Sequence, residues 1–220
     1  GWYIFKCPRV VHFGCPLTRF REELSLNTIF DRVETGYFDA FGKHPGPGER
    51  RSWENSYPRL VGALALLPED TVITLEERMP IGGPRADATL CGTSPDGTEF
   101  FVIIELKAWS QASATSTDDF LVSGLAGVHQ HPAIQVNSYC TTMLDYYAAF
   151  QQERAPTVAG CAFCFNLDTN LEADLVGGVM VQRKMDKRAI KNKLVQEQLF
   201  RPHPSSCRCE GIRAQQLWNG

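Results

Sequence analysis

Long hydrophobic runs are missing from this sequence. Runs such as residues 100–104 and 61–67 fall far short of the roughly 18 apolar residues that a membrane-spanning helix needs. No basic segment followed by an apolar stretch and a cleavage site opens the chain, so we expect no secretion signal. We therefore expect a protein that has no membrane partner.

The sequence also lacks a strong charge of one sign. Its 22 basic and 25 acidic side chains leave a net charge of −3, which is not the balance of a protein that binds nucleic acid over its whole surface. Basic residues do gather in residues 183–193, where six of them face a single acid, Asp186. We interpret this stretch as a helix face in water. The alternative is a local patch that binds phosphates through Lys187, Arg188 and Lys191.

The eight cysteines show neither a disulfide framework nor a complete zinc motif. Cys161 and Cys164 lie three positions apart in an apolar segment typical of a strand, where they point to opposite faces and do not hold one ion. Cys207 and Cys209, with His203, come closer to a zinc cluster but lack a fourth ligand. We therefore expect reduced thiols and a cytoplasmic protein.

With 43% apolar and 21% charged residues over 220 positions, the chain is able to bury the core of one globular domain. Helical spacing predicts helices at residues 17–33, at 52–67 with Ser52 as the N-cap, and from His131 to about residue 152. Alternation predicts strands at residues 71–77, 85–91, 99–108, 158–165 and 175–182, and residues 110–127 are predicted to form a loop. The fold class is therefore α/β, with a central mixed sheet flanked by helices.

One pair of predicted strands forms a hairpin that carries charged residues. Residues 92–97 are a turn sequence with Asp-Gly near its tip, so the strands on either side pair antiparallel. The numbers of paired residues then sum to about 190–193, which places Asp87 opposite residues 103–106. Glu105 and Lys107 are two positions apart on the second strand and project from one face. Asp87, Glu105 and Lys107 are thus predicted to meet.

Two carboxylates and one ammonium group at one place favour metal-dependent hydrolysis. Carboxylate oxygens bind hard divalent cations, here Mg²⁺ or Mn²⁺, and such a cation acidifies a water and neutralises a phosphate oxygen. Lys107 is then able to position that water or to stabilise charge in the transition state. The alternative is a salt-bridge cluster at the end of a strand, which is a common role for Glu-x-Lys alone.

The same residues form a known signature. Pro84-Arg-Ala-Asp87 followed by Glu105-Leu-Lys107 resembles the motif of the PD-(D/E)XK nucleases, which have a restriction-endonuclease-like core; here the Pro stands three residues before the Asp instead of next to it. More narrowly, the chain is similar to the nuclease-like N-terminal domain of the Schlafen-group-3-like DNA/RNA helicases. That likeness covers residues 17–165 and lies in the segments Glu49-x-x-Ser-Trp-x-Asn-Ser56, Arg85-x-Asp87, Ile104-Glu-Leu-Lys-x-Trp109 and His131-Pro-x-x-Gln-x-x-x-Tyr139.

The resemblance implies further site residues. Related nucleases often place an additional acid at the site. The candidates for this role are Glu49, which would be a catalytic acid, and Glu76, which would be a further metal ligand. The alternative for Glu49 is a favourable charge at a helix N-terminus. Gln135 and Tyr139 are i, i+4 on one helix face, where such a Gln orients active-site groups or the phosphate; otherwise Gln135 is a surface residue and Tyr139 a core residue. Arg85 and Tyr139 are expected to contact nucleic acid.

The resemblance also implies an activity and a domain organisation. Residues 1–170 form the nuclease-like domain, and residues 171–220 form a C-terminal extension with the basic helix. We expect a metal-dependent nuclease, with DNA favoured over RNA as its substrate. No Walker A pattern, G-x-x-x-x-G-K-[ST], occurs in the sequence, so a helicase would be a partner or a missing domain. The rival interpretations are a nucleic-acid-binding module with little catalysis and a zinc-bound interaction domain built on Cys207 and Cys209.

Overall fold

The structure is a computed structural model in which residues 13–79, 84–93, 97–115, 119–122, 124–152 and 155–166 are described. Several predicted features lie outside these residues. They are the strand at residues 175–182, the basic stretch with Lys187, Arg188 and Lys191, the cysteines Cys207 and Cys209, and the whole extension at residues 171–220.

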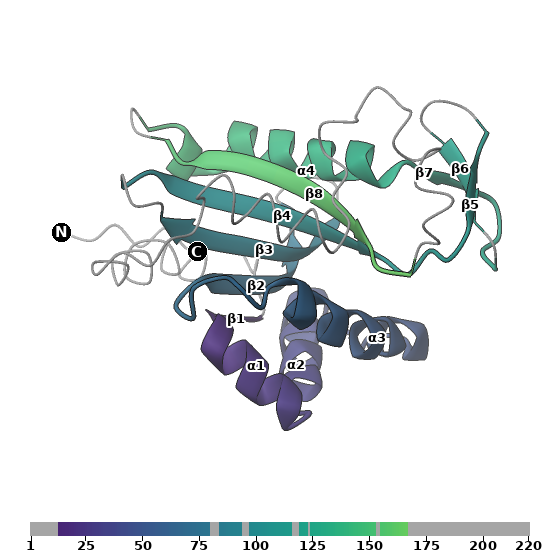
Figure 1. The fold of residues 1–220 in the computed structure, drawn as a ribbon, viewed down its shortest axis with the longest axis horizontal. Helices are drawn as coiled ribbons and strands as arrows, with labels where there is room; N and C mark the ends of the chain where they lie inside the picture. Colours follow the sequence, from purple (N-terminus) through teal and green to yellow (C-terminus); the bar gives the residue numbers. More distant parts are fainter. Residues whose placement is uncertain are drawn as a thin grey trace.

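The centre of the fold is a mixed sheet of five strands (Figure 1). In spatial order they are β1 (Phe13–Pro16), β2 (Val72–Arg78), β3 (Arg85–Thr93), β4 (Glu99–Lys107) and β8 (Thr157–Cys164). The first four pair antiparallel, whereas β8 runs parallel to β4. The predicted α/β class with a mixed sheet is confirmed, and the predicted hairpin is the β3–β4 pair.

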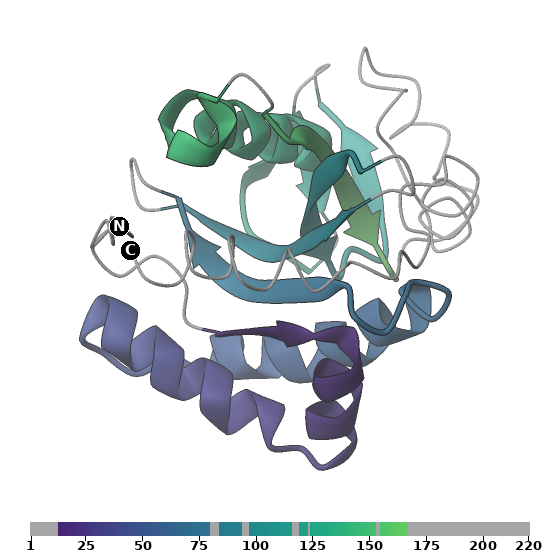
Figure 2. The same cartoon turned by 90° about the vertical axis from the view of Figure 1, so that its left-hand side faces the viewer.

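Helices cover both faces of this sheet (Figure 2). On one face lie α1 (Leu17–Ser25), α2 (Ile29–Phe41) and α3 (Pro47–Ala63); on the other lie α4 (Pro132–Tyr146) and the short 3-10 helix η1 (Ala148–Phe150). Each face has its own hydrophobic core, to which Tyr57 of α3 and Met143 of α4 contribute, respectively. Among the described residues, no helix is both long enough and apolar enough to cross a membrane.

The helix predicted at residues 17–33 is in fact two helices. α1 ends at Ser25, and Asn27 adopts a left-handed backbone conformation with a φ of 58° before α2 begins. Asn is one of the few residues with a side chain that adopts this conformation readily. The apolar pattern continues across the turn because Phe20 and Ile29 pack into the same core. Periodicity therefore did not reveal the break.

α3 begins earlier than predicted. Pro47 occupies its first turn, where the missing N–H of proline is no loss, and the residue before the helix is Gly46. Ser52, predicted as the N-cap, therefore lies inside the helix. The earlier start places Glu49 in the first turn of α3, where a negative charge is favourable.

A second sheet forms where residues 110–127 were predicted as a loop. Its strands are β5 (Ala112–Ala114), β6 (Asp119–Val122) and β7 (Val128–Gln130), which pair antiparallel in that order. The sheet has a hydrophobic cluster of its own, made of Trp109, Ala112, Phe120 and Val122. Three- and four-residue strands carry too little alternation to be recognised from sequence. Figure 1 shows this small sheet beyond the end of β4 and close to the start of α4.

α4 approaches the large sheet very closely at Gly160 of β8. A Cβ atom at this position would lie 2.1 Å from Cγ1 of Val136 and 2.8 Å from Sγ of Cys140, both on α4. Because such short contacts do not occur in close-packed proteins, glycine is required for this depth of packing. The helix is capped at its start by His131, whose Nδ1 accepts a hydrogen bond from the N–H of Ala133 at 3.0 Å. His131 is therefore the N-cap of α4.

Candidate active site

The β3–β4 hairpin brings two carboxylates together. Its register pairs Ala88 with Ile104, and the next position along sets Asp87 opposite Glu105, within the range that the turn predicts. Oδ2 of Asp87 accepts a hydrogen bond from the N–H of Leu106 at 2.7 Å. Glu105 is 2% exposed, and Asp87 is half-buried. The structure therefore places the two acids side by side in a largely enclosed position.

Lys107 reaches the same place from the end of β4. Its Nζ donates a hydrogen bond to Oε1 of Glu105 at 2.6 Å. The Lys107 side chain is 21% exposed and that of Glu105 is 3% exposed, so the ammonium group meets solvent while the carboxylate lies beneath it. The second oxygen, Oε2 of Glu105, is buried and has no hydrogen-bond partner among the described residues. An unpartnered buried acceptor is destabilising, and a bound cation would satisfy it.

The electrostatics of the pair favour an additional positive charge. Burial and then the charge of Asp87 raise the pKa of Glu105 to about 8. Lys107 and a hydrogen bond with Gln135 act in the opposite direction. Burial likewise raises the pKa of Asp87, although the N–H of Leu106 and the charge of Lys107 oppose it. One ammonium group therefore does not balance the two carboxylates, whereas a divalent cation would.

Glu76 of β2 joins the site through an irregular backbone. Its φ is 54°, a left-handed conformation that costs a residue with a side chain about 1–3 kcal/mol. Side chains normally alternate across a strand, yet Leu75 and Glu76 both point toward α3, where Oη of Tyr57 donates a hydrogen bond to Oε1 of Glu76 at 3.3 Å. Burial and the charge of Asp87 raise the pKa of Glu76 to about 8. The strained residue thus brings a third carboxylate into the field of Asp87.

Arg85, predicted to contact nucleic acid, is paired within the chain. Its guanidinium group forms an ion pair with Oε1 of Glu49. Its Nη1 atom also lies 3.4 Å from Oε2 of Glu76. It also lies over the ring of Tyr37, 4.9 Å from the centroid, in a cation–π arrangement. Glu49 and Glu76, which compete for one accessory role, are therefore joined by a shared cation. The structure brings both to the side of the site formed by α3 and β2.

α4 supplies Gln135 and Tyr139 to the same cluster. Nε2 of Gln135 donates a hydrogen bond to Oη of Tyr139 at 2.7 Å, and Gln135 also hydrogen-bonds Glu105. Tyr139 is buried, and burial together with the charge of Glu105 raises its pKa to about 12. Both side chains thus face the carboxylates, as their i, i+4 spacing predicts. Tyr139 is at once a core residue and a neighbour of Glu105.

The donor set fits a divalent cation that keeps much of its own water. Within the described ranges, no group of three or more His, Cys, Asp or Glu side chains is arranged as a complete metal cage. Mg²⁺ does not require one, because proteins usually hold it with one or two carboxylates, several waters and substrate phosphates. Asp87 and Glu105 supply two carboxylates, and Oε2 of Glu105 lacks any other partner among the described residues. Glu76, predicted as a further ligand, accepts a hydrogen bond from Tyr57 on Oε1, and its Oε2, 3.4 Å from Nη1 of Arg85, is likewise buried without a hydrogen-bond partner among the described residues.

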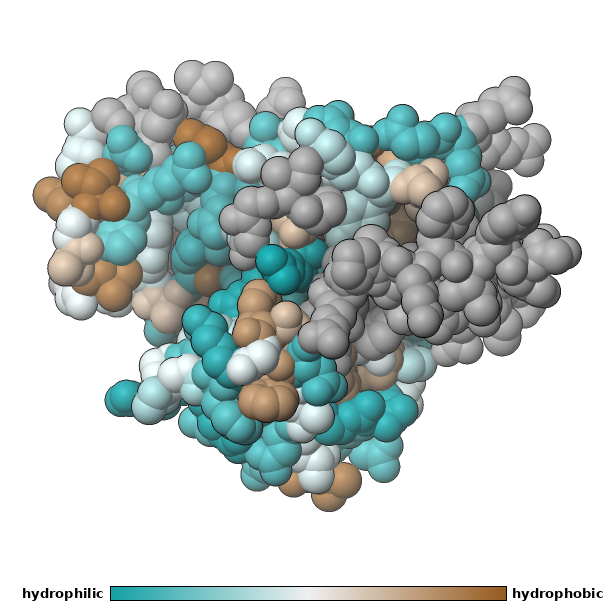
Figure 3. Space-filling model, turned by 180° about the vertical axis from the view of Figure 1, so that it is seen from behind, coloured by the Kyte–Doolittle hydropathy of each residue, from teal (hydrophilic) through white to brown (hydrophobic). Residues whose placement is uncertain are grey.

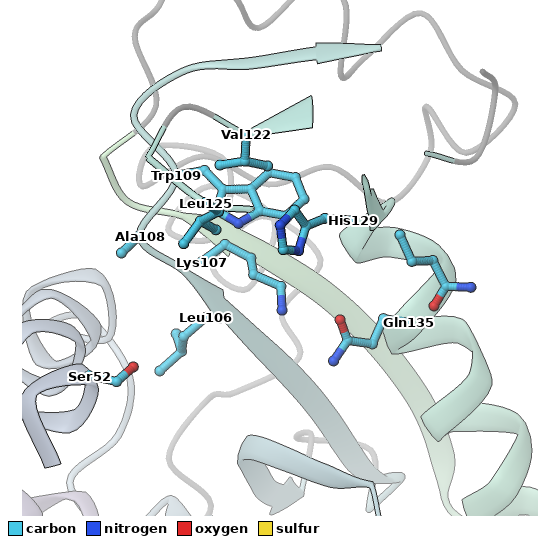
Figure 4. A pocket seen from close by; sticks show the side chains of 10 residues that line it. Ser52, Leu106, Lys107, Ala108, Trp109, Val122, Leu125, His129 and Gln135 are labelled. Carbon is cyan, nitrogen blue, oxygen red and sulfur yellow. The ribbon is translucent and has the colours of Figure 1, made fainter. Parts of the chain in front are cut away.

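A pocket of about 390 Å³ opens beside Lys107 and Gln135. Figure 4 shows the ends of these two side chains directed into one space, with the rings of Trp109 and His129 next to it. The remaining lining residues come from α3, from the end of β4 and from the small sheet with its turn: Ser52, Leu106, Ala108, Val122, Leu125 and Gln130. Nothing in the sequence pattern revealed the contributions of Leu125, His129 and Gln130, because contacts between the small sheet and β4 leave no periodic signal.

A further buried carboxylate, which the sequence did not reveal, lies next to Glu76. Glu77 is fully buried, and its carboxylate accepts hydrogen bonds from Oη of Tyr147 at 2.9 Å and from Oγ1 of Thr74 at 3.1 Å. Burial raises the pKa of Glu77, while these hydrogen bonds lower it. Glu77 therefore ties β2 to the segment after α4, and it fixes the strand immediately beside the strained Glu76.

Comparisons with known proteins find no match for this chain. No family model, no curated protein and no solved structure is similar enough to assign it. The likeness to the PD-(D/E)XK nucleases therefore rests on the motif residues themselves. Of these, Asp87, Glu105, Lys107, Gln135 and Tyr139 lie together in the structure.

Proposed function

We propose that this protein is a metal-dependent nuclease that hydrolyses phosphodiester bonds at Asp87, Glu105 and Lys107. From its motif residues, we also propose that it belongs to the PD-(D/E)XK nucleases of restriction-endonuclease-like fold. Within them, we place it among the relatives of the nuclease-like domain of the Schlafen-group-3-like helicases. One observation carries the proposal. Oε2 of Glu105 is a buried carboxylate oxygen without a donor among the described residues, next to a second carboxylate and to an ammonium group bonded to the other oxygen.

Asp87 and Glu105 are the residues that would hold Mg²⁺ or Mn²⁺. When bound, such a cation neutralises a phosphate oxygen and supplies an acidified water. The chain holds both carboxylates in place beforehand: the N–H of Leu106 fixes Asp87, and Lys107 and Gln135 bond to Glu105. Preorganised groups of this kind stabilise charge without rearranging during the reaction.

Lys107 lies between the carboxylates of Asp87 and Glu105 and the pocket, where it would contact the substrate. Its ammonium group has three donors, of which one bonds to Glu105, while the side chain also lines the pocket. The remaining donors orient the attacking water or bind the phosphate as negative charge develops on it. Glu49, Glu76 and Arg85 support the site from the side of α3, since Arg85 offsets the charge of two acids that would otherwise repel Asp87.

The rival is a nucleic-acid-binding module that keeps this arrangement but cuts nothing. The test is cleavage of single- and double-stranded DNA and RNA in Mg²⁺, in Mn²⁺ and in chelator. We expect metal-dependent cleavage, with DNA ahead of RNA, and its loss in Glu105→Gln. Glu22→Gln removes an exposed carboxylate of α1 and is the matched control, which should cleave as the parent does. Binding of every substrate without cleavage would favour the nucleic-acid-binding module, which would act with a partner helicase. Cleavage in chelator would contradict metal dependence.

A further inference from the structure

We infer that the pocket beside Lys107 receives one unpaired nucleobase, so that the substrate is a single strand or a flipped-out nucleotide. The inference rests on the proposed nuclease function, because it names the form in which that substrate enters the site. It is carried by the position, the chemistry and the size of the pocket.

The pocket and the carboxylate pair share two residues. Lys107 bonds to Glu105 and lines the pocket, and Gln135 does the same from α4. Figure 4 shows the amine of Lys107 and the amide of Gln135 at the same opening. A strand whose phosphate meets Lys107 would therefore lay an adjoining base against the pocket.

The wall of the pocket suits a flat, uncharged ring. Leu125 is 50% exposed in it, with Val122 and Trp109 as further apolar surface. The ring of His129 stands edge-on to that of Trp109, with centroids 6.2 Å apart. Among the described residues that line the pocket there is no carboxylate, and Lys107 is its one Lys or Arg. This is the combination that an apolar heterocycle attached to a phosphate requires.

Hydrogen-bonding groups are present for the edge of such a ring. Nε2 of His129 is buried and has no hydrogen-bond partner in the described part of the chain. Buried polar atoms almost always have one, and a base edge would supply it. Gln130 and Gln135 each carry an amide that both donates and accepts, and Ser52 adds a hydroxyl group from α3.

The size of the pocket suits a single nucleotide. About 390 Å³ lies within the range of about 300–1,000 Å³ that small ligands occupy. A base within a duplex would have to be flipped out, at the expense of stacking and pairing. A single strand presents its bases without that expense, and such bases bind readily to aromatic and apolar surfaces.

Two leucines of the small sheet and its turn provide a matched pair of variants. Leu125 lines the pocket and Leu121 of β6 does not, yet each is 50% exposed. Figure 3 shows hydrophobic atoms on the surface at the end of the molecule where the small sheet lies, and Leu121, Leu125 and Val128 are its exposed apolar residues. Leu125→Trp would fill the pocket, whereas Leu121→Trp adds the same ring to the surface outside it.

The experiment measures equilibrium binding in Ca²⁺, used in place of Mg²⁺ to slow hydrolysis. The probes are a short single strand, the same strand with abasic positions, and the matching duplex, each as DNA and as RNA where the chemistry allows. The parent protein should bind the base-bearing strand on the order of ten-fold more tightly than the abasic strand, as expected for stacking of one base. Leu125→Trp should abolish this difference, and Leu121→Trp should keep it.

Equal affinity of the parent protein for base-bearing and abasic strands would overturn the inference. Tighter binding of the duplex than of the single strand would also overturn it if Leu125→Trp left the binding of the duplex unchanged. The abasic comparison needs no variant, so it holds even if Leu125→Trp does not fold. The inference and the nuclease proposal fail separately. Cleavage in Mg²⁺ without base-dependent binding would contradict a role of the pocket in binding a base. Base-dependent binding without cleavage in Mg²⁺ would contradict the nuclease proposal.

Discussion

Glu76 and Asp87 face each other at the interrupted position of the β2–β3 pair. The register pairs Leu75 with Ala88 and Glu77 with Ala86, and it omits the position between them. The side chains at that position are both carboxylates, and the charge of Asp87 is second only to burial in raising the pKa of Glu76. The sheet is thus irregular at the place where two acids meet. Backbone strain of this kind is typical of functional sites.

Asp87→Asn should remove most of the nuclease activity and leave the fold intact. Asn keeps the shape of Asp and is still able to accept the hydrogen bond of Leu106, but it lacks the ligand charge. Without metal, the variant should unfold at the same temperature as the parent or higher, because repulsion with Glu76 and Glu105 is relieved. Metal-dependent cleavage and thermal unfolding in chelator measure the two effects. Asp145→Asn, at an exposed position of α4, is the control, and full cleavage by Asp87→Asn would contradict its role as a ligand.

The metal-free protein should lose stability as the pH rises from about 6 to about 8.5. The pKa of Glu76 and of Glu105 is about 8 in the folded protein, against an ordinary value of 4.5. Between these values the folded state binds more protons than the unfolded state. The stability contributed by the two groups is therefore complete below the ordinary pKa and is lost as the pH rises through the folded one.

Thermal unfolding in chelator across this pH range tests that expectation. Glu105→Gln should flatten the dependence, because one of the two titrating groups is gone. Mg²⁺ or Mn²⁺ should raise the unfolding temperature more at the upper end of the range, since a cation binds the deprotonated carboxylates. A parent protein whose unfolding temperature does not change over this range would show that the raised pKa values are wrong.

Local rules were enough to predict the carboxylate pair. The turn at residues 92–97 sets the register of the hairpin, and the two-residue period of a strand puts Glu105 and Lys107 on one face. These rules placed Asp87 opposite residues 103–106, and the observed register sets it opposite Glu105. The i, i+4 spacing of Gln135 and Tyr139 is local in the same sense, and their hydrogen bond follows from it.

Contacts between distant segments were not predictable in this way. Arg85 and Glu49 are 36 positions apart, and nothing in either segment indicates that they pair. The left-handed conformation of Glu76 has no sequence signal, because glutamate rarely adopts it. The small sheet was missed because its strands of three or four residues carry too little alternation to be recognised. In each case, tertiary packing decides the conformation.

Lys107→Ala should slow cleavage by about 10²–10³, the loss seen when one electrostatic stabiliser is removed from an active site. Affinity for nucleic acid should fall far less, because one phosphate contact among several is a small share of binding. Single-turnover cleavage in Mg²⁺ and binding in Ca²⁺ separate the two. Lys43→Ala, which removes an exposed lysine between α2 and α3, should change neither. Cleavage at the parental rate by Lys107→Ala would exclude a catalytic role for this residue.

The basic stretch at residues 183–193 should behave as a solvated surface. If Lys187, Arg188 and Lys191 instead bind phosphates, their replacement by Ala should weaken binding of all sequences alike. It should also reduce the slope of log affinity against log salt by about one for each phosphate that is no longer neutralised. Binding measured over a series of salt concentrations gives that slope. An unchanged slope supports the solvated surface, and a reduced slope contradicts it.

The interface between α4 and β8 has no tolerance for an added methyl group at Gly160. Val136, which a Cβ atom there would strike first, is the residue that follows Gln135 on the helix. A larger side chain at position 160 would therefore shift the helix that carries Gln135 and Tyr139 while leaving the hairpin of Asp87 and Glu105 where it is. The spacing between the amide of Gln135 and the carboxylate of Glu105 is thus controlled from a strand that contributes no polar side chain to the site. A substitution at position 160 can therefore misalign α4 with the β3–β4 hairpin while both carboxylates of the site are still present.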